Sequence, residues 1–336
     1  MSRRIRILAT GGTIAGTANQ WGGYAAGQVS VETLLSSLPS RVQGVVVSYE
    51  QLANVGSQSI TNQIWCQLAN RINEISSDDL ADAIVITHGT DTMEETAYFL
   101  NLVTLGRIPV VLTGAMKPAD DSSPDGPENL LSAIYLACCE QAANLGVLVV
   151  MNSAIHSARY IQKTGSNQEN AFQSAPLGLL GMQHGSRTCL YVDRLHSLHT
   201  GGTIFTKAIQ TKTFHLDSDA LPEVNILYLH AGMSHEMLSR SMAMPHQGIV
   251  VAGVGSGNIS DALEPMLARQ VAAGTVVVRS SRLAFGHVAR NMEVDDDKHG
   301  FVAAGSLNPS KARVLLQLAL AMKLSIAEIQ ALYKTH

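Results

Sequence analysis

Residues 83–103 read AIVITHGTDTMEETAYFLNLV, and this stretch decides the fold class. Residues 83–87 form a short apolar run, which is typical of a strand buried on both faces of a sheet. Residues 93–103 repeat their apolar side chains at a helical period, and the polar loop His88-Gly-Thr-Asp91 separates the two segments. A buried strand followed closely by a helix is the repeating unit of a parallel α/β sheet.

The same alternation continues on both sides of this stretch. Further strands are predicted at residues 5–9, 44–49, 110–113, 147–151, 224–229, 249–252 and 275–278. Helices are predicted around residues 129–141, 236–243 and 262–273. Another helix is expected after Asn308-Pro309, with Asn308 as its N-cap and Pro309 in its first turn.

The pattern is interrupted at residues 191–221, which are polar and contain several histidines and β-branched residues. We interpret this part as a connecting segment or a short hairpin region. A chain of 336 residues also exceeds one comfortable hydrophobic core. We therefore predict an α/β protein with two domains, residues 1–190 and 222–336, each a mainly parallel sheet flanked by helices.

Composition narrows the class of protein. Apolar residues make up 46% of the chain and charged residues 15%, which is the balance of a soluble globular protein. The net charge is −4 and no Lys/Arg cluster occurs, so we expect no nucleic-acid partner and no anionic membrane surface. No apolar run reaches the roughly 18 residues that a membrane span requires.

The N-terminal sequence and the spacing of the cysteines indicate in which cellular compartment we expect the protein. The apolar stretch after the basic start at residues 1–10 is too short for a signal peptide and predicts a first strand instead. We expect a cytoplasmic protein, or a periplasmic one if a leader was removed before residue 1. The cysteines lack the CxxC spacing of metal or redox sites and are predicted to be reduced thiols: Cys66, Cys138, Cys139 and Cys189.

Three loops at the ends of predicted strands carry unusual residues, and in open α/β sheets ligands bind at this edge. The first is Gly11-Gly-Thr-Ile-Ala-Gly16. Glycines allow a tight turn with exposed N–H groups, which suits an anion or a developing oxyanion. The loop is not a Walker motif, because no Gly-Lys-Ser/Thr follows it, and its glycine spacing does not match a dinucleotide fingerprint. Thr13 places a β-branched hydroxyl in this loop, and a plain strand-to-loop turn is the alternative interpretation.

The second loop is His88-Gly-Thr-Asp91, at the end of the opening strand. Thr92 and Glu95 have capping-box spacing, which predicts that both stabilise the start of the following helix. Capping leaves Thr90 and Asp91 unexplained, a hydroxyl and a carboxylate just beyond a strand.

The third loop, residues 253–258, reads GVGSGN after a predicted strand. Its glycines suggest a nucleotide site, but no acidic residue follows the next strand to hold a ribose. His235-Glu236 lacks the second histidine of a zinc-protease helix. Asp295-Asp-Asp297 is predicted to be a solvated acidic loop rather than a cation site, and we expect no metal and no cofactor.

Several stretches together resemble the bacterial L-asparaginase and glutaminase-asparaginase family almost from end to end. They are ILATGGTIAG (7–16), NVGSQ (54–58), VITHGTDTMEETAYFL (85–100), GAMKP (114–118), DGPENL (125–130), GVLVVMN (146–152), MEVDD (292–296) and GFVAAGSLNPSKARVLLQLAL (300–320). The resemblance implies cofactor-free hydrolysis of L-asparagine to L-aspartate and ammonia through a threonine nucleophile and an acyl-enzyme. It also implies a weaker activity on L-glutamine.

The resemblance assigns the catalytic roles residue by residue. Thr13 matches the nucleophile, and Tyr24 on an N-terminal lid matches its hydrogen-bond partner. Thr90, Asp91 and Lys163 match a second cluster in which the lysine supports the threonine. From the residues alone, Lys163 reads as an ordinary surface lysine in a polar loop.

Substrate binding is implied in the same way. Ser57 and Gln58, with Asp91, match a clamp for the α-carboxylate and α-amino groups. Backbone N–H groups of Gly12, Thr13 and Thr90 are the expected oxyanion donors. The backbone at Ala115 matches a contact to the side-chain amide.

The resemblance also implies a shared site. Asn258 and Glu293 match residues that a neighbouring subunit donates, in a homotetramer built as a dimer of intimate dimers. Two departures stand out: a disulfide of some secreted relatives is absent, because Ser76-Ser77 and Leu105-Gly106 occupy its places, and Trp21 stands in the lid.

Other classes remain as alternatives. A subunit of a tRNA-dependent amidotransferase shares the threonine motifs but is expected to carry an additional N-terminal domain. A silent amino-acid-binding protein would be expected to lose Thr13, Thr90 or Lys163, and all three are present. A nucleotide-binding protein fits only the isolated glycine loops.

Overall fold

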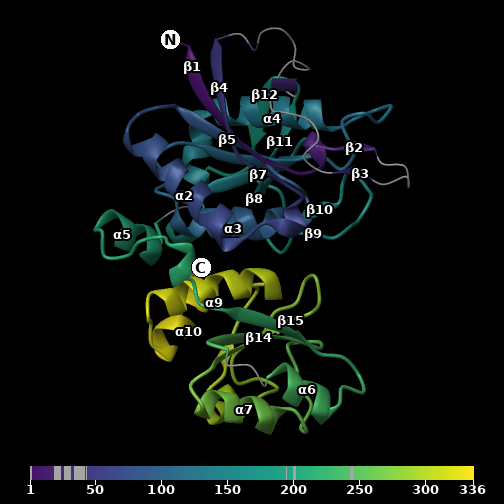
Figure 1. Cartoon of the computed structure of the whole chain (residues 1–336), viewed down its shortest axis with the longest axis vertical. Helices are drawn as coiled ribbons and strands as arrows, with labels where there is room; N and C mark the ends of the chain where they lie inside the picture. The colour runs from purple at the N-terminus through teal and green to yellow at the C-terminus, as the bar shows by residue number, and fades with distance from the viewer. Residues whose placement is uncertain are drawn as a thin grey trace. The chain divides into compact units, whose positions relative to one another are not determined.

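The computed structural model describes residues 2–18, 24–25, 32–33, 42, 44–193, 195–199, 202–242 and 246–336. It divides into two compact units, Met1–Leu216 and Asp217–His336. Figure 1 traces the chain from purple at the N-terminus to yellow at the C-terminus.

The first unit is built on an eight-stranded sheet with the order β12-β11-β8-β7-β6-β5-β1-β4. Strands β4, β1, β5, β6 and β7 pair in parallel, and β8, β11 and β12 extend the sheet antiparallel. Their bounds are β1 (Arg3–Gly11), β4 (Val45–Val55), β5 (Ala83–Thr87), β6 (Val110–Thr113), β7 (Val147–Met151), β8 (Ala154–Ser157), β11 (Gly181–His184) and β12 (Arg187–Leu190). Two small sheets join β2 (Thr17–Ala18) to β3 (Tyr24–Ala25) and β9 (Ile161–Lys163) to β10 (Phe172–Ser174).

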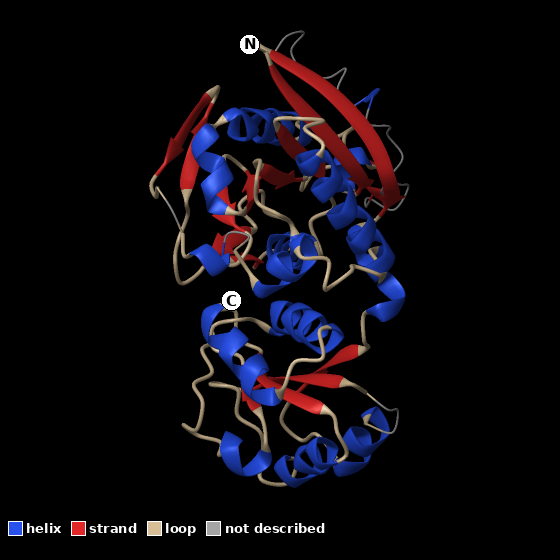
Figure 2. Ribbon diagram, turned by 90° about the vertical axis from the view of Figure 1, so that its left-hand side faces the viewer, coloured by secondary structure: helices blue, strands red, loops and turns tan. Residues whose placement is uncertain are grey.

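Helices cover both faces of this sheet (Figures 1 and 2). Helix α4 (Gly126–Cys138) packs on β5, β6 and β7, and its apolar residues join side chains such as Val85, Val111 and Leu148 in one buried cluster. Helices α2 (Asn62–Ser77) and α3 (Met93–Val103) pack against each other, and α3 contacts β7. The alternate strand residues Ile84 and Ile86 are fully buried too, so the parallel strands are covered on both faces.

The strand order creates a switch point at the first strand. From β1 the chain moves to β4 on one side and later returns to β5 on the other. At such a point the loops that follow the two neighbouring strands diverge and leave a crevice at their carboxyl ends, where ligands bind. Here these loops are the Thr13 loop after β1 and the Thr90 loop after β5.

The second unit contains a parallel four-stranded sheet with the order β13-β14-β15-β16. Helices α9 and α10 pack on this sheet, as does α7. A buried apolar cluster that includes Val251, Leu267 and Phe301 forms its core. The bounds are β13 (Val224–Tyr228), β14 (Gly248–Gly253), β15 (Val276–Ser281), β16 (Val302–Ala303), α6 (His235–Ser241), α7 (Glu264–Ala272), α8 (Asp296–His299), α9 (Pro309–Ala321) and α10 (Ile326–Thr335).

The predicted fold class is confirmed, with a mainly parallel sheet flanked by helices in each unit. Asn308 caps α9 as predicted, because its side chain accepts a hydrogen bond from the Lys311 N–H. All four cysteines are free, as predicted. None of the helices in the described part of the chain is both long and apolar enough to cross a membrane.

Two differences from the predicted elements have a clear local cause. Helix α4 begins three residues before the predicted start at residue 129, because Asp125 lies at its N-cap and a proline occupies its first turn. The segment after β12 contains a helix, α5 (Ile204–Gln210), whose N-cap Thr203 accepts a hydrogen bond from the Thr206 N–H.

Candidate active site

The loops after β1 and β5 touch through their backbones. Gly12 has φ 85°, a backbone conformation that side chains rarely adopt. A Cβ at Gly12 would lie 2.3 Å from the Gly89 nitrogen. Only glycine therefore fits at this contact, which holds the two threonine loops against each other.

Thr13 begins a short 3₁₀ helix, Thr13–Ala15, and is 2% exposed. The structure gives its hydroxyl no hydrogen bond to another described residue, so the group is not committed to the fold. Of the expected oxyanion donors, the Gly12 N–H is already used, because it donates to the Val55 carbonyl at 2.9 Å. The N–H groups of Thr13 and Thr90 make no such bond among the described residues and remain candidate donors.

Thr90, Asp91 and Lys163 form one cluster, as the resemblance implies. The Lys163 Nζ atom donates to the Thr90 Oγ1 at 2.9 Å and to the Asp91 Oδ1 at 2.6 Å. Thr90 is 3% exposed, whereas half of the Asp91 side chain is open to solvent. The cluster therefore combines a buried hydroxyl with a carboxylate that a ligand can reach.

Lys163 is neither in a loop nor an ordinary surface lysine, and both of these predictions from the residues are wrong. It ends strand β9, and only 16% of its side chain is exposed. Its backbone N–H donates to the Glu94 Oε2 at 2.7 Å. Glu94 was not among the predicted site residues, and its place four residues after Thr90, in the first turn of α3, is the only signal for it in the sequence.

Ser57 and Gln58 lie in the short helix Ser57–Ser59, directly beyond β4. The Ser57 Oγ accepts a hydrogen bond from the Asp91 N–H at 3.1 Å. The Thr92 hydroxyl donates to the Ser57 carbonyl at 2.8 Å instead of capping α3, so the predicted capping box is wrong. Gln58 is exposed. The hydroxyl of Thr92 thus ties the Ser57 segment to the Thr90 loop.

The loop that carries Ala115 follows β6 and leaves the sheet at the same edge as the Thr90 loop. Ala115 is fully buried. Asp125 accepts hydrogen bonds from the N–H groups of the two residues after Ala115, at 2.9 Å each. Asn129 donates to the Gly114 carbonyl at 3.1 Å and to Asp125 at 3.0 Å. The side chains of Asp125 and Asn129, both in the DGPENL stretch, therefore hold the loop that carries Ala115 in place.

His88, directly before Gly89, is fully buried and saturated with hydrogen bonds. The Trp65 indole N–H donates to the Thr96 Oγ1 at 2.8 Å, and the Thr96 hydroxyl lies 2.9 Å from the His88 Nε2. This leaves the His88 Nδ1 to donate to the Gly89 carbonyl, 2.6 Å away. Burial without a charge partner lowers the pKa of His88 from 6.5 to about 4. The neutral His88 side chain therefore supports the Thr90 loop through its hydrogen bond to the Gly89 carbonyl.

We expect His88→Gln to flatten the pH dependence of stability between pH 6.5 and about 4. The folded state holds His88 at a pKa below that of the unfolded chain, so the unfolded state binds more protons in this window. The stabilisation is complete above pH 6.5 and is lost as the pH falls towards 4, by about 3 kcal/mol. Thermal melting at a series of pH values measures this slope. The same change at exposed His184 should leave the slope of the parent, and an equal slope in His88→Gln and the parent contradicts the assignment.

In the second unit, Asn258 closes the turn after β14. Val254 and Asn258 exchange backbone hydrogen bonds at 3.2 and 2.7 Å, so both of these N–H groups are unavailable to a phosphate. The side-chain oxygen of Asn258 has no hydrogen-bond partner among the described residues. Glu293 is exposed in the loop before α8.

The predicted solvated loop at Asp295–Asp297 is wrong at its middle residue. Asp296 is fully buried and pairs with the Arg279 guanidinium, at 2.6 Å for its shortest contact. Asp295 caps α8, and the Asp297 carboxylate pairs with Arg290. Each carboxylate thus has a structural partner.

Tyr24 belongs to β3, but its side chain and the rest of the predicted lid around Trp21 lie outside the described residues. Among the residues that the structure does describe, no group of three or more His, Cys, Asp or Glu side chains is arranged to hold a metal ion.

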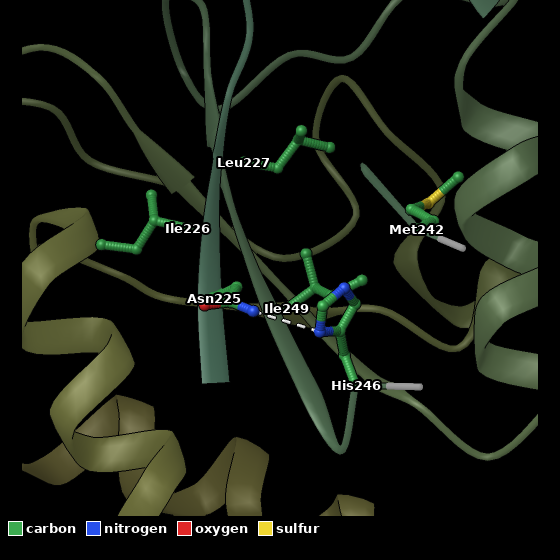
Figure 3. Close-up of a pocket in the computed structure, with 6 residues that line it drawn as sticks. All are labelled: Asn225, Ile226, Leu227, Met242, His246 and Ile249. Carbon is green, nitrogen blue, oxygen red and sulfur yellow. Dashed lines mark hydrogen bonds between the residues drawn. The ribbon is translucent and has the colours of Figure 1, made fainter. Parts of the chain in front are cut away.

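Two cavities of the second unit differ in whether a predicted site residue lines them. One of about 220 Å³ (Figure 3) is lined by Asn225 and His246, whose Nδ2 and Nδ1 atoms lie 3.1 Å apart, and by none of the predicted site residues. Another of about 360 Å³ has Asn258 and Arg282 in its wall, at the carboxyl ends of β13 and β14. Of the two, only the latter borders a candidate site residue.

Two models of known protein families match this chain. The family model "Asparaginase, N-terminal" matches residues 4–196, and "Glutaminase/Asparaginase C-terminal domain" matches residues 223–333. The first match contains the Thr13, Thr90 and Lys163 segments, and the second contains Asn258 and Glu293.

Individual relatives match over nearly the whole chain. A protein of Haemophilus influenzae named "Probable L-asparaginase periplasmic" is 44% identical over 94% of this chain and 88% of its own. "L-asparaginase 2" of Escherichia coli is 42% identical over 99% and 93%, and "Glutaminase-asparaginase" of Acinetobacter glutaminasificans is 37% identical over 98% of each chain. The crystal structure of "Probable Cytoplasmic L-asparaginase" from Campylobacter jejuni superposes with a TM-score of 0.90 at 38% identity and covers 100% of both chains. The chain therefore belongs to the asparaginase family.

Proposed function

We propose that the protein hydrolyses L-asparagine to L-aspartate and ammonia, with a weaker activity on L-glutamine. The observation that carries the proposal is the contact of the Lys163 Nζ with both Thr90 and Asp91, beside the Thr13 loop at the switch point of the sheet. Relatives named L-asparaginase and glutaminase-asparaginase support the substrate class.

The proposed reaction proceeds through Thr13 in two steps. The Thr13 oxygen bonds to the side-chain amide carbon, the C–N bond breaks, and the nitrogen leaves as ammonia with the proton of the hydroxyl. Water then attacks the resulting ester, the C–O bond breaks, and a proton returns to Thr13 as L-aspartate leaves. The free N–H groups of Thr13 and Thr90 would stabilise the oxyanion, and one such donor is typically worth about 3 kcal/mol.

Lys163 and Thr90 would control the protons. In the structure the Lys163 ammonium donates to both neighbours, and a protonated amine cannot accept a proton. The base role therefore requires that Lys163 first lose a proton; the neutral amine could still donate to Asp91 while its lone pair accepts the Thr90 proton. The substrate's α-ammonium would compete for the Asp91 carboxylate, so binding and activation would be linked through this residue.

The remaining residues would select the substrate. Ser57 and Gln58, together with Asp91, would clamp the α-carboxylate and α-amino groups, which excludes simple amides. The backbone at Ala115, held by Asp125, would contact the side-chain amide. Gly12 keeps the two threonine loops in contact.

A second copy of the chain would complete the site. We propose that Asn258 and Glu293 are donated by a neighbouring subunit and that Tyr24 covers the site from its own chain. The proposed assembly is the homotetramer of two intimate dimers that the family resemblance implies, and closed two-fold contacts within each dimer would produce such sites in pairs.

Lys163→Met should lower kcat for L-asparagine by about 10²- to 10⁴-fold with little change in KM. The methionine keeps most of the length of the side chain and removes the group that controls the proton on Thr90. Steady-state kinetics separate the two constants. Lys207→Met, at an exposed position of the same unit, is the matched control and should behave like the parent. If only KM rises, Lys163 is a binding residue and its proton role is wrong.

Ammonia release from L-asparagine and L-glutamine, measured side by side, tests the proposed function directly. Release from L-asparagine exceeding that from L-glutamine is the expected result. A thermal shift with L-aspartate and none with ATP or NAD would separate this proposal from a nucleotide-binding role. No ammonia from either amide, with an aspartate shift retained, would indicate a silent amino-acid-binding protein.

A further inference from the structure

A buried ion pair in the second unit connects the two segments that carry Asn258 and Glu293. Arg279 lies on β15 and Asp296 opens α8, and their side chains are 1% and 0% exposed. The Arg279 Nε donates to one carboxylate oxygen at 2.6 Å, and its Nη2 donates to the other at 2.7 Å. This two-pronged contact fixes the orientation of both groups.

The same guanidinium reaches the turn that carries Asn258. Its Nη1 donates to the Gly257 carbonyl at 3.0 Å. Gly257 has φ 79°, and a Cβ there would lie 2.7 Å from the Val288 Cγ2, so the backbone is seated tightly against this side chain. Arg279 therefore holds the peptide bond that leads directly into Asn258.

The carboxylate of Asp296 fixes the other segment. It accepts a hydrogen bond from the Asn291 N–H at 2.9 Å. The Asn291 side chain and Asp297 bond to each other in both directions, at 2.6 and 3.1 Å. These contacts close a short loop, and Glu293 is exposed between its two tied ends.

Stability alone does not account for this arrangement. A buried ion pair is often replaced by apolar residues of similar volume without loss of stability, because removing both charges from water is costly. Apolar side chains cannot replace the directional bonds to the Gly257 carbonyl and the Asn291 N–H. Those two bonds are the specific contribution of the pair.

We propose that Arg279 and Asp296 are positioning residues that set the distance and orientation between Asn258 and Glu293. The inference rests on the proposed function, because it takes these two residues as contacts to the substrate in a neighbouring chain's site. The pair itself touches no substrate. It acts by presenting both contacts as one rigid piece.

The main test is the double variant Arg279→Met with Asp296→Leu, which removes both charges and keeps an apolar core. We expect it to fold and assemble like the parent, with kcat/KM for L-asparagine reduced by about 10- to 100-fold. The reduction should lie mainly in KM, since the lost contacts bind the substrate. Arg279→Lys keeps the charge but not the two-pronged contact with Asp296. Its kcat/KM should lie between that of the double variant and that of the parent.

Glu50→Gln is the matched control, because it breaks an arginine–carboxylate pair with Arg71 in the other unit. It should lower thermal stability without the change in KM. Mixed oligomers give a second readout at substrate concentrations well below the parent KM. The double variant should regain activity when assembled with Thr13→Ala chains and none with Glu293→Ala chains, because its lesion lies in the donated half of the site.

The outcomes are separable. Kinetic constants of the folded double variant within about twofold of the parent overturn the positioning role. So does equal recovery with both partner variants. If the double variant fails to assemble, Arg279→Lys decides the question by the same two measurements. If Thr13→Ala and Glu293→Ala fail to restore each other, the shared site of the proposed function is wrong, whereas the effect of the pair on KM is still measured in its own right.

Discussion

Replacement of Thr13 by alanine should remove nearly all turnover of L-asparagine, with kcat reduced by roughly 10⁴-fold or more. The reason is that the substitution deletes the proposed attacking atom. Thr13 is 2% exposed and its hydroxyl bonds to no other described residue, so the fold should tolerate the change. Binding of L-aspartate, followed by thermal shift, should persist because the proposed clamp at Ser57 and Asp91 remains.

Two further substitutions at Thr13 separate the effect of losing the hydroxyl from the effect of changing the shape of the side chain. Thr13→Val keeps the branched side chain without the hydroxyl and should be as inactive as Thr13→Ala. Thr13→Ser keeps the hydroxyl and should retain measurable turnover, reduced because the serine side chain samples more rotamers. Activity of Thr13→Val within a few-fold of the parent would exclude Thr13 as the nucleophile and direct attention to Thr90.

Much of the parallel sheet could be predicted from the sequence, because its strands are short apolar runs with polar residues on both sides. Three of them, Ala83–Thr87, Val110–Thr113 and Val147–Met151, have the predicted bounds. The antiparallel extension by β8, β11 and β12 could not be predicted. Its strands are four residues long: burial alternates in β11 and is partial in β12, and the buried β8 ends in His156 and Ser157, so no apolar run marks them.

The two threonine loops could be predicted because strand ends in an α/β sheet point to one edge. The cluster around Lys163 was predicted only through the family resemblance and could not be derived from the pattern of residues. Its Nζ reaches Thr90 from more than 70 residues away in the chain, and β9 is only three residues long. The buried role of Asp296 was also hidden, because a run of three aspartates has the composition of an exposed loop. In both cases the deciding partner, Thr90 or Arg279, is distant in sequence.

Two inactive variants should restore each other if the site is shared between chains. Thr13 belongs to the first unit and Glu293 to the second, and the proposal assigns the two to different chains of one dimer. In a mixed dimer of Thr13→Ala and Glu293→Ala chains, one site receives both lesions and the other receives neither. With random pairing half of the dimers are mixed, so roughly a quarter of the parent activity should return.

The measurement requires co-expression or joint refolding, because an intimate interface exchanges its subunits slowly. Glu293→Ala must first prove nearly inactive alone, and Lys163→Met provides an internal control: as a lesion of the first unit, it should be restored by Glu293→Ala but not by Thr13→Ala. This pattern of pairs cannot arise from a general loss of stability, which would affect every combination alike. If both single variants are inactive and the mixed oligomer is inactive as well, Glu293 acts only within its own chain or not at all, and the shared-site proposal fails.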